Sequence, residues 1–235
     1  MAAPIFSTIA LIPAHNEEAT VGLIVAQVRE LWQCPVVVID DCSRDATAQV
    51  ARTAGATVLP LTIQLGAWGA IQTGLRYALR QGYHTAITLD ADGQHGPASI
   101  GVLLEPLVRD QADVSIGAFP ERASRARRLA WSYFRWLTGL KLEDITSGFR
   151  AYNHKAMRVL ASSEASLFDY QDVGVLLILR RQGLRIVEAP VPMHPRANGA
   201  SRVFRSWLIV GKYMLQTSLL CIARVGYNHS PPADC

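Results

Sequence analysis

The chain has 235 residues, of which 50% are hydrophobic, and its formal net charge is +4 at pH 7. It contains no repeat, low-complexity tract or linker, which excludes a repeat array or a disordered chain and fits one large α/β domain. The four cysteines lack metal-ligating spacing, and the N-terminus lacks a charged segment followed by a long apolar run, so we expect a reducing cytosol and no secretion.

Short β-branched runs alternate with helical patterns through the first half of the chain. The runs predict strands at residues 7–13, 36–40, 56–59, 85–90 and 113–117. The helical patterns predict helices at residues 17–32, 44–54, 67–80 and 97–109. This alternation is typical of a mainly parallel sheet flanked by helices, in which ligands bind beyond the carboxyl ends of the strands.

Polar clusters follow three of the predicted strands. They are IPAHNEE at 12–18, VIDDCSRDAT at 38–47 and LDADGQH at 89–95. Because the carboxyl ends of parallel strands lie at one edge of a sheet, we expect a single site to collect all three clusters.

The third cluster contains two aspartates, Asp90 and Asp92, separated by one residue. Side chains alternate along a strand, so both carboxylates can point the same way where the strand leaves the sheet. Such a pair can hold Mg²⁺ or Mn²⁺, which take one or two carboxylates plus substrate phosphates, and Gln94 can add a carbonyl oxygen. The alternative is a polar turn after a buried strand.

The segment QLGAWGAIQTGL at 64–75 is rich in glycine but lacks both the Lys-Ser/Thr of a P-loop and the spacing of a dinucleotide site. We therefore expect Gly66, Gly69 and Gly74 to allow close packing of a helix start rather than to cradle phosphate directly.

A basic segment follows the fifth predicted strand. Residues 122–141 contain no acidic residue and six basic ones, which are Arg122, Arg125, Arg127, Arg128, Arg135 and Lys141. Trp131, Tyr133, Phe134 and Trp136 interleave with them in a helical pattern suited to a membrane surface, which predicts an anionic partner. A helix that only packs its aromatic side into the core is the alternative. No RNA- or DNA-binding motif occurs, so we expect no nucleic-acid partner.

Residues 206–223 are mostly apolar but are interrupted by Lys212 and Gln216. A membrane-spanning helix needs about 20 apolar residues with few charges. We therefore divide the chain into a domain at 1–202 and a C-terminal amphipathic helix and tail at 203–235, which lies on the membrane or binds a membrane-protein subunit.

Six motifs now occur in the order and at roughly the spacing of family 2 glycosyltransferases. They are the clusters at 12–18, 38–47, 64–75 and 89–95, DITSGFRAY at 144–152 and PRANGASR at 195–202. The chain resembles the dolichol-phosphate mannosyltransferase or polyprenyl-phosphate glycosyltransferase branch over about residues 8–205. The resemblance implies a GT-A fold, the Rossmann-like fold of nucleotide-diphospho-sugar transferases, with a nucleotide-diphosphate sugar donor, a Mg²⁺ or Mn²⁺ cofactor and inversion at the anomeric carbon.

The resemblance also implies the residues of the donor site. Donor contacts fall on Pro13, His15, Glu17, Ile39, Asp41, Asp90, Ala91, Arg196 and Arg202. His15 would stack on the base, although a plain surface histidine is the alternative, and Asp41 would read the base edge. As alternatives, Asp40 braces this loop, and an N-cap role fits Asp41 and Ser43 equally well. Asp45 is expected to be a cap.

The metal ligands implied by the resemblance are Asp90, Asp92 and Gln94, and Asp92 is the principal catalytic residue, through a metal that stabilises the leaving diphosphate. Arg196 and Arg202 would close over the phosphates. Relatives often carry Lys where Arg202 stands, which keeps the charge but changes the geometry.

For the acceptor, Arg128 and Ser132 match the family's contacts to a lipid phosphate. The family usually has Gly-Ser-Arg after the fifth strand, where this chain has Gly117, Ala118 and Phe119, so Arg122 or Arg125 would have to substitute. Asp144 is the second catalytic candidate, as general base if the acceptor is a sugar hydroxyl. Otherwise it fixes its loop through backbone N–H groups or Arg150.

We therefore expect transfer to polyprenyl phosphate by an enzyme that is cytoplasmic and peripheral on the inner face of the membrane. A sugar-nucleotide pyrophosphorylase is disfavoured because the N-terminal motif lacks the glycine-rich signature with Lys that grips a nucleoside triphosphate. A non-catalytic sugar-nucleotide-binding subunit is disfavoured because Asp90 and Asp92 are both retained.

Overall fold

The computed structural model describes residues 7–119, 121, 125–140, 142–167 and 173–193. Its strands are β1 (Thr8–Ala14), β2 (Val36–Asp40), β3 (Thr57–Pro60), β4 (Thr85–Thr88), β5 (Val114–Ala118), β6 (Arg150–Asn153) and β7 (Ile186–Pro190). Its α-helices are α1 (Val21–Trp32), α2 (Thr47–Thr53), α3 (Gly66–Arg80), α4 (Ile100–Val108), α5 (Arg125–Thr138), α6 (His154–Leu160) and α7 (Val173–Arg181).

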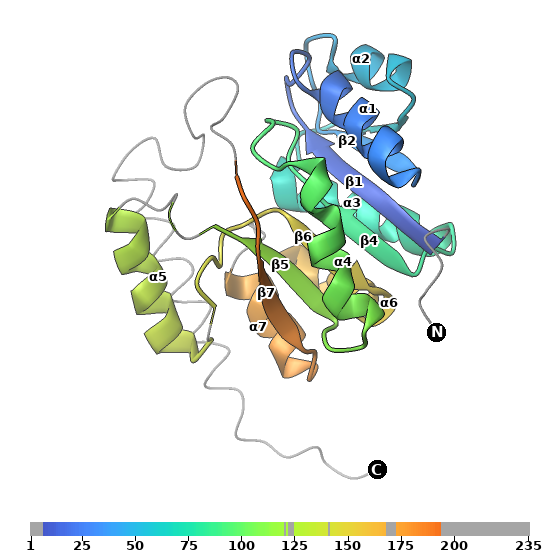
Figure 1. The fold of residues 1–235 in the computed structure, drawn as a ribbon. Coiled ribbons are helices and arrows are strands. Elements are labelled where there is room, and N and C mark those ends of the chain that lie inside the picture. The colour runs from blue at the N-terminus through green and yellow to red at the C-terminus, as the bar shows by residue number, and fades with distance from the viewer. Residues whose placement is uncertain (1–6, 120, 122–124, 141, 168–172, 194–235) are drawn as a thin grey trace.

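The seven strands form one sheet in the order β3-β2-β1-β4-β6-β5-β7, with helices on both faces (Figure 1). All neighbouring pairs are parallel except the two made by β6, which runs antiparallel to β4 and to β5. The predicted fold class, a mainly parallel sheet flanked by helices, is therefore confirmed. Because of its direction, β6 begins at the edge where the parallel strands end.

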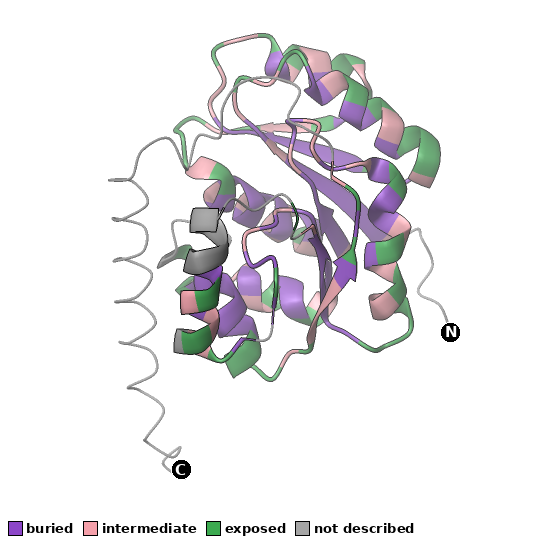
Figure 2. Ribbon diagram, turned by 60° about the vertical axis from the view of Figure 1, so that its left-hand side comes forward, coloured by how far each residue is buried: buried purple, intermediate pink, exposed green. Residues whose placement is uncertain are grey.

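The core has one layer on each face of the sheet, as the alternation along β1 shows. Ile9 and Leu11 join the layer that contains α3, α6 and α7, whereas Ala10 and Ile12 join the layer that contains α1 and α4. The inner strands are accordingly buried, whereas the edge strands β3 and β7 are partly exposed, as are the outward faces of the helices (Figure 2).

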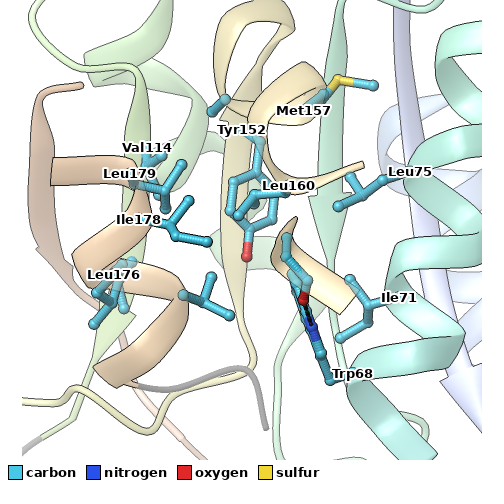
Figure 3. Packing of buried hydrophobic residues seen from close by; sticks show 14 of the residues in the cluster. Trp68, Ile71, Leu75, Val114, Tyr152, Met157, Leu160, Leu176, Ile178 and Leu179 are labelled. Carbon is cyan, nitrogen blue, oxygen red and sulfur yellow. Dashed lines mark hydrogen bonds between the residues drawn. The ribbon is translucent and has the colours of Figure 1, made fainter. Parts of the chain in front are cut away.

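Hydrogen bonds join helix α3 to the last residue of α6 and to the segment that follows α6. Trp68 Nε1 donates to the Ala165 carbonyl at 2.8 Å, and Gln72 Nε2 donates to the Leu160 carbonyl at 2.8 Å. Figure 3 shows Trp68 and neighbouring apolar side chains of α3 facing Leu160 in the core. A Cβ on Gly74 would lie 2.8 Å from Ile39 Cδ1, so this glycine allows the close packing expected of the glycine-rich segment.

The five predicted strands are all present, β2 with the predicted bounds and the other four with shifts of one or two residues at their ends. All four predicted helices begin at different residues from those predicted. Helix α3 begins one residue earlier, at Gly66, whereas α1 begins later at Val21, α2 at Thr47, and α4 at Ile100, after a 3₁₀ turn at Pro97–Ser99. Residues before α1 and α2 bond to each other instead, as when the Glu17 N–H donates to Thr47 Oγ1 at 2.8 Å. No helix in the described ranges is long and apolar enough to cross a membrane.

Candidate active site

The polar clusters after β1, β2 and β4 lie at the same edge of the sheet and contact one another. The Asp41 N–H donates to the Ala14 carbonyl at 2.8 Å, and Thr20 Oγ1 donates to the Ala91 carbonyl at 2.6 Å. A fourth segment reaches this edge because β6 is antiparallel. Thr88 Oγ1 donates to the Gly148 carbonyl at 2.8 Å, just before β6 begins.

The two aspartates of the third cluster lie in the turn that follows β4. The Asp90 side chain is 39% exposed, whereas Asp92 is 8% exposed. Asp92 Oδ1 accepts a hydrogen bond from the Gln94 N–H at 3.0 Å, and Gly93 has a φ of +80°, which this tight turn requires. A Cβ on Gly148 would lie 2.8 Å from Asp90 Oδ1, so the loop before β6 packs closely against this carboxylate and leaves no room for a side chain.

The side chains of this turn are suited to bind a divalent cation whose coordination is completed by a substrate. Within the described ranges, no group of three or more His, Cys, Asp or Glu side chains could hold a metal ion by itself. Mg²⁺, however, is commonly bound by one or two carboxylates together with substrate phosphates and water. Asp90 and Asp92 offer hard oxygen ligands of this kind, and Gln94 lies in the same turn.

His95 closes this turn and was not among the predicted site residues. The Asp90 N–H donates to His95 Nδ1 at 3.0 Å, and the imidazole stacks on Phe149 with ring centroids 5.0 Å apart. His95 is only 1% exposed. The sequence signal was its place in the strand-end cluster, immediately after Gln94.

The loops after β1 and β2 are held together at the predicted donor site. Pro13 and Ile39 are partners in the parallel register of these strands. His15 is half-buried, and its Nδ1 lies 2.7 Å from the Asp41 carbonyl oxygen. The Asn16 Oδ1 accepts the Arg44 N–H at 2.8 Å. These contacts place Pro13, His15 and Ile39 together, while their contact with a donor stays a prediction.

Asp41 is 3% exposed, and its carboxylate braces the start of α3. Its two oxygens accept the N–H groups of Leu65 and Gly66 at 2.6 and 2.9 Å. Asp40 Oδ1 accepts the Ser43 N–H at 3.1 Å, so it braces its own loop, which agrees with the alternative given for it. The contact of Asp41 with a donor base stays a prediction, and the observed contacts are those of a structural carboxylate.

Asp45 was expected to be a cap, but the N-cap residue of α2 is Ala46, and Asp45 lies one residue before it. Its Oδ1 accepts the N–H of Thr47, the first residue of α2, at 3.0 Å. Burial raises the pKa of the Asp45 carboxyl, but hydrogen bonds from Thr47 and from the Glu18 N–H outweigh burial and leave the pKa below its usual value.

Asp144 is fully buried and fixes the loop before β6. Its Oδ2 accepts the Phe119 N–H at 3.4 Å, and its Oδ1 accepts from Thr146 Oγ1 at 3.3 Å. Arg150, also fully buried, donates to the carbonyls of Ser147 and Ile145 at 2.7 and 3.0 Å. The loop-fixing alternative for Asp144 therefore agrees with the observed contacts.

Glu188 on β7 supports the same loop and was missed by the sequence reasoning. Its carboxylate accepts the backbone N–H groups of Asp144 at 2.7 Å and of Glu143 at 2.8 Å. Burial raises the pKa of Glu188; these N–H groups lower it in part, and the nearby negative charges of Asp144 and Glu143 raise it further. No local pattern in the sequence links β7 to this loop.

Several predicted site residues fall outside what the structure describes. Arg122, Arg196, Arg202 and the predicted C-terminal unit at 203–235 lie outside the described residues. The backbone of Arg128 lies in α5, which confirms the helix expected in the basic segment, and Ser132 is exposed on the same helix. The role of each in binding donor or acceptor stays a prediction.

This sheet and its loops define the GT-A fold of glycosyltransferases. Glucosyl-3-phosphoglycerate synthase from Mycobacterium tuberculosis, solved with Mn²⁺, uridine diphosphate and phosphoglyceric acid, superposes with a TM-score of 0.70 at 21% identity, covering 95% of this chain and 80% of that chain. The family profile described as Glycosyl transferase family 2 matches residues 9–162. The chain belongs to glycosyl transferase family 2.

Two relatives match along most of their length. The undecaprenyl-phosphate mannosyltransferase of Micrococcus luteus is 32% identical over 224 residues, which is 88% of this chain and 91% of the relative. The polyprenol monophosphomannose synthase of Mycolicibacterium smegmatis is 29% identical over 220 residues, 85% of this chain and 82% of the relative.

Proposed function

We propose that this chain is an inverting, metal-dependent glycosyltransferase that moves a sugar from a nucleotide-diphosphate sugar to a polyprenyl phosphate. The observation that carries the proposal is the similarity to the Micrococcus luteus undecaprenyl-phosphate mannosyltransferase, which extends over 88% of this chain and 91% of that enzyme. The carboxylate pair Asp90 and Asp92 in the turn that follows β4 agrees with it. The enzyme would work at the cytoplasmic face of the membrane.

On the donor side, the leaving group is a nucleoside diphosphate whose oxygens gain negative charge in the transition state. Asp90, Asp92 and Gln94 are the residues that would hold Mg²⁺ or Mn²⁺, which when bound supplies Lewis-acid stabilisation of that charge. The N–H of Gln94 orients the Asp92 carboxylate through the 3.0 Å hydrogen bond. Arg196 and Arg202 are proposed as further cations at the diphosphate.

On the acceptor side, the contacts of Asp144 favour a phosphate nucleophile. A phosphate monoester has a second pKa of about 6, so it is mostly dianionic at neutral pH and needs cations more than a general base. Asp144 is fully buried and already bonded to Phe119 and Thr146, which suits a structural role. We propose that Arg128 and Ser132 of α5, with Arg122, contact the acceptor phosphate.

The exposed side of α5 supports association with a membrane surface. Trp136 is 80% exposed on this basic helix, and tryptophan favours the boundary between lipid and water. We propose that residues 203–235 add an amphipathic helix and tail that bind the membrane or a membrane-protein subunit.

The proposal is tested by incubating the full chain with radiolabelled UDP-glucose, UDP-N-acetylglucosamine or GDP-mannose, with and without undecaprenyl phosphate, followed by organic extraction. We expect label in the organic phase for one donor, only when the lipid and a divalent cation are present. Label transferred to a water-soluble sugar, with none in the organic phase, would replace the lipid acceptor by a sugar hydroxyl.

The substitution Asp144→Asn separates the two acceptor classes. With a phosphate acceptor we expect substantial activity to remain, because the nucleophile is ionised without help and Asn can keep part of the loop's hydrogen bonds. With a hydroxyl acceptor, loss of the general base would cost about 10² to 10⁴ in kcat. A folded variant that binds donor normally yet transfers at under roughly a hundredth of the original rate would refute the phosphate acceptor.

The substitution Arg128→Ala is expected to weaken the acceptor far more than the donor. A charge-assisted hydrogen bond contributes about 1.5 to 3 kcal/mol, which corresponds to a loss on the order of 10-fold or more in acceptor KM or kcat. Donor affinity measured by calorimetry should stay within a few-fold. Arg109→Ala at the C-cap of α4, which removes an exposed arginine paired with Glu105, is the charge-matched control and should change neither value. Equal losses for donor and acceptor would place Arg128 elsewhere.

A further inference from the structure

The turn that contains Asp90 and Asp92 is held by residues around it. Thr20 Oγ1 binds the carbonyl of Ala91, between the two aspartates, at 2.6 Å. His95 Nδ1 accepts the Asp90 N–H at 3.0 Å. The backbone of the turn is therefore fixed by side chains that are not themselves predicted metal ligands, and His95 is the one that contacts Asp90 directly.

The His95 ring is itself fixed in place. It is 1% exposed and lies nearly parallel to the Phe149 ring, with an interplanar angle of 14° and centroids 5.0 Å apart. The backbone of His95 also forms an antiparallel bridge with Met193, just beyond β7. The ring thus joins the turn after β4 to the loop that enters β6 and can transmit the position of that loop to Asp90.

The hydrogen bond from the Asp90 N–H shows which role the imidazole has. A backbone N–H can only donate, so Nδ1 must keep its lone pair, and the ring proton lies on Nε2. Asp90 Oδ2 is 3.7 Å from Nδ1, beyond hydrogen-bond length, so an ion pair with a protonated ring does not account for the geometry. His95 therefore acts as a hydrogen-bond acceptor for the backbone N–H of Asp90.

We propose that His95 is a positioning residue that holds the Asp90 carboxylate for the divalent cation, by accepting the Asp90 N–H while stacked on Phe149. This inference rests on the proposed metal-dependent function. Groups that orient a metal ligand without touching the metal commonly change metal affinity by about 10- to 100-fold when they are removed. His95 acts in this way through the backbone of the ligand.

Two substitutions at His95 separate this role from simple packing. His95→Asn keeps an acceptor, since Asn Oδ1 takes nearly the place of Nδ1, but it removes the ring. His95→Phe keeps a ring that can stack on Phe149 but removes the acceptor and leaves the Asp90 N–H without it. If His95 positions Asp90, the acceptor is needed, and His95→Phe should weaken Mn²⁺ binding more. If His95 only fills space, the ring is needed, and His95→Asn should weaken Mn²⁺ binding more.

The measurement is Mn²⁺ binding by the full chain, followed by the EPR signal of free Mn²⁺, in separate titrations with UDP and with GDP and without any acceptor lipid. We expect His95→Phe to weaken Mn²⁺ binding by about 10- to 100-fold and His95→Asn to stay within about threefold of the original chain. Wild-type affinity in His95→Phe, or an equal or larger loss in His95→Asn, overturns the inference.

Two controls keep the outcome decisive. If circular dichroism shows that His95→Phe is unfolded, His95→Gln replaces it, because the Gln carbonyl lies nearer the Nε2 position and should not restore Mn²⁺ binding. Asp92→Ala gives the baseline. If Asp92→Ala also binds Mn²⁺ like the original chain, the proposed metal site itself fails; if it loses Mn²⁺ while His95→Phe does not, the His95 inference alone fails.

Discussion

Replacing Asp92 with alanine is expected to abolish sugar transfer while the fold stays intact. A Lewis-acidic metal supplies several kcal/mol to the transition state, and each 1.36 kcal/mol is about tenfold in rate, so the loss should reach roughly a thousandfold or more. The hydrogen bond from the Gln94 N–H is lost as well, at about 1 kcal/mol of stability. Transfer rates, circular dichroism and the unfolding midpoint measure the two effects.

The same prediction has a chemical counterpart. Transfer should collapse in EDTA and recover when Mg²⁺ or Mn²⁺ is added in excess. Asp110→Ala is the matched control, because it removes a carboxylate that is 90% exposed and pairs with Arg185 away from the turn after β4. Full activity in chelator, or equal losses in Asp92→Ala and Asp110→Ala, would contradict the role of the metal.

Replacing Gly148 with alanine is expected to reduce transfer by about 10²-fold without preventing folding. A Cβ at this position would lie 2.8 and 3.0 Å from the two Asp90 carboxylate oxygens, so the carboxylate must move. Misplacement by about 1 Å can cost on the order of 10²-fold in rate. Gly148 is not among the described glycines with positive φ, so the backbone itself accepts alanine there. The expected signature is a higher Mn²⁺ requirement.

Gly22→Ala is the control for the clash itself. A Cβ on Gly22 would also meet an atom at 2.8 Å, but that atom is Val50 Cγ1 on α2. This variant should lower the unfolding midpoint while leaving the Mn²⁺ requirement unchanged. If Gly148→Ala affects only stability, as Gly22→Ala is expected to do, the loop before β6 does not set the position of Asp90.

The sequence predicted strands that are themselves apolar and β-branched. The run at 36–40 is apolar and β-branched until its last residue, and β2 has the predicted bounds. In contrast, β6 reads Arg-Ala-Tyr-Asn, and its arginine is fully buried because it donates to carbonyls of its own loop. Hydrophobic periodicity carries no signal for such a strand, so neither β6 nor the antiparallel pairing was predicted.

In the candidate site, too, the residues that are close in the sequence were predicted and the contacts between distant residues were not. Motif order located Asp90, Asp92 and Gln94 in one turn, because these residues are close in the sequence. The bracing by Asp41 of the start of α3, 24 residues later, and the support of the Asp144 loop by Glu188, 44 residues later, depend on tertiary contacts. The family resemblance assigned Asp41 to the base, and the local pattern assigned it to a nearby cap, because neither could show that the start of α3 lies beside it.

Folding must bring distant segments together before the turn after β4 reaches its final position. The hydrogen bond from Thr20 to Ala91 spans 71 residues, and that from Thr88 to Gly148 spans 60. We expect contacts of such sequence separation to form late, because loop closure opposes them. A chain in which β1 to β4 are paired but β6 is still outside the sheet would lack the loop that packs against Asp90. Metal and nucleotide would therefore favour the complete sheet over this intermediate, and ligand protection would report the entry of β6.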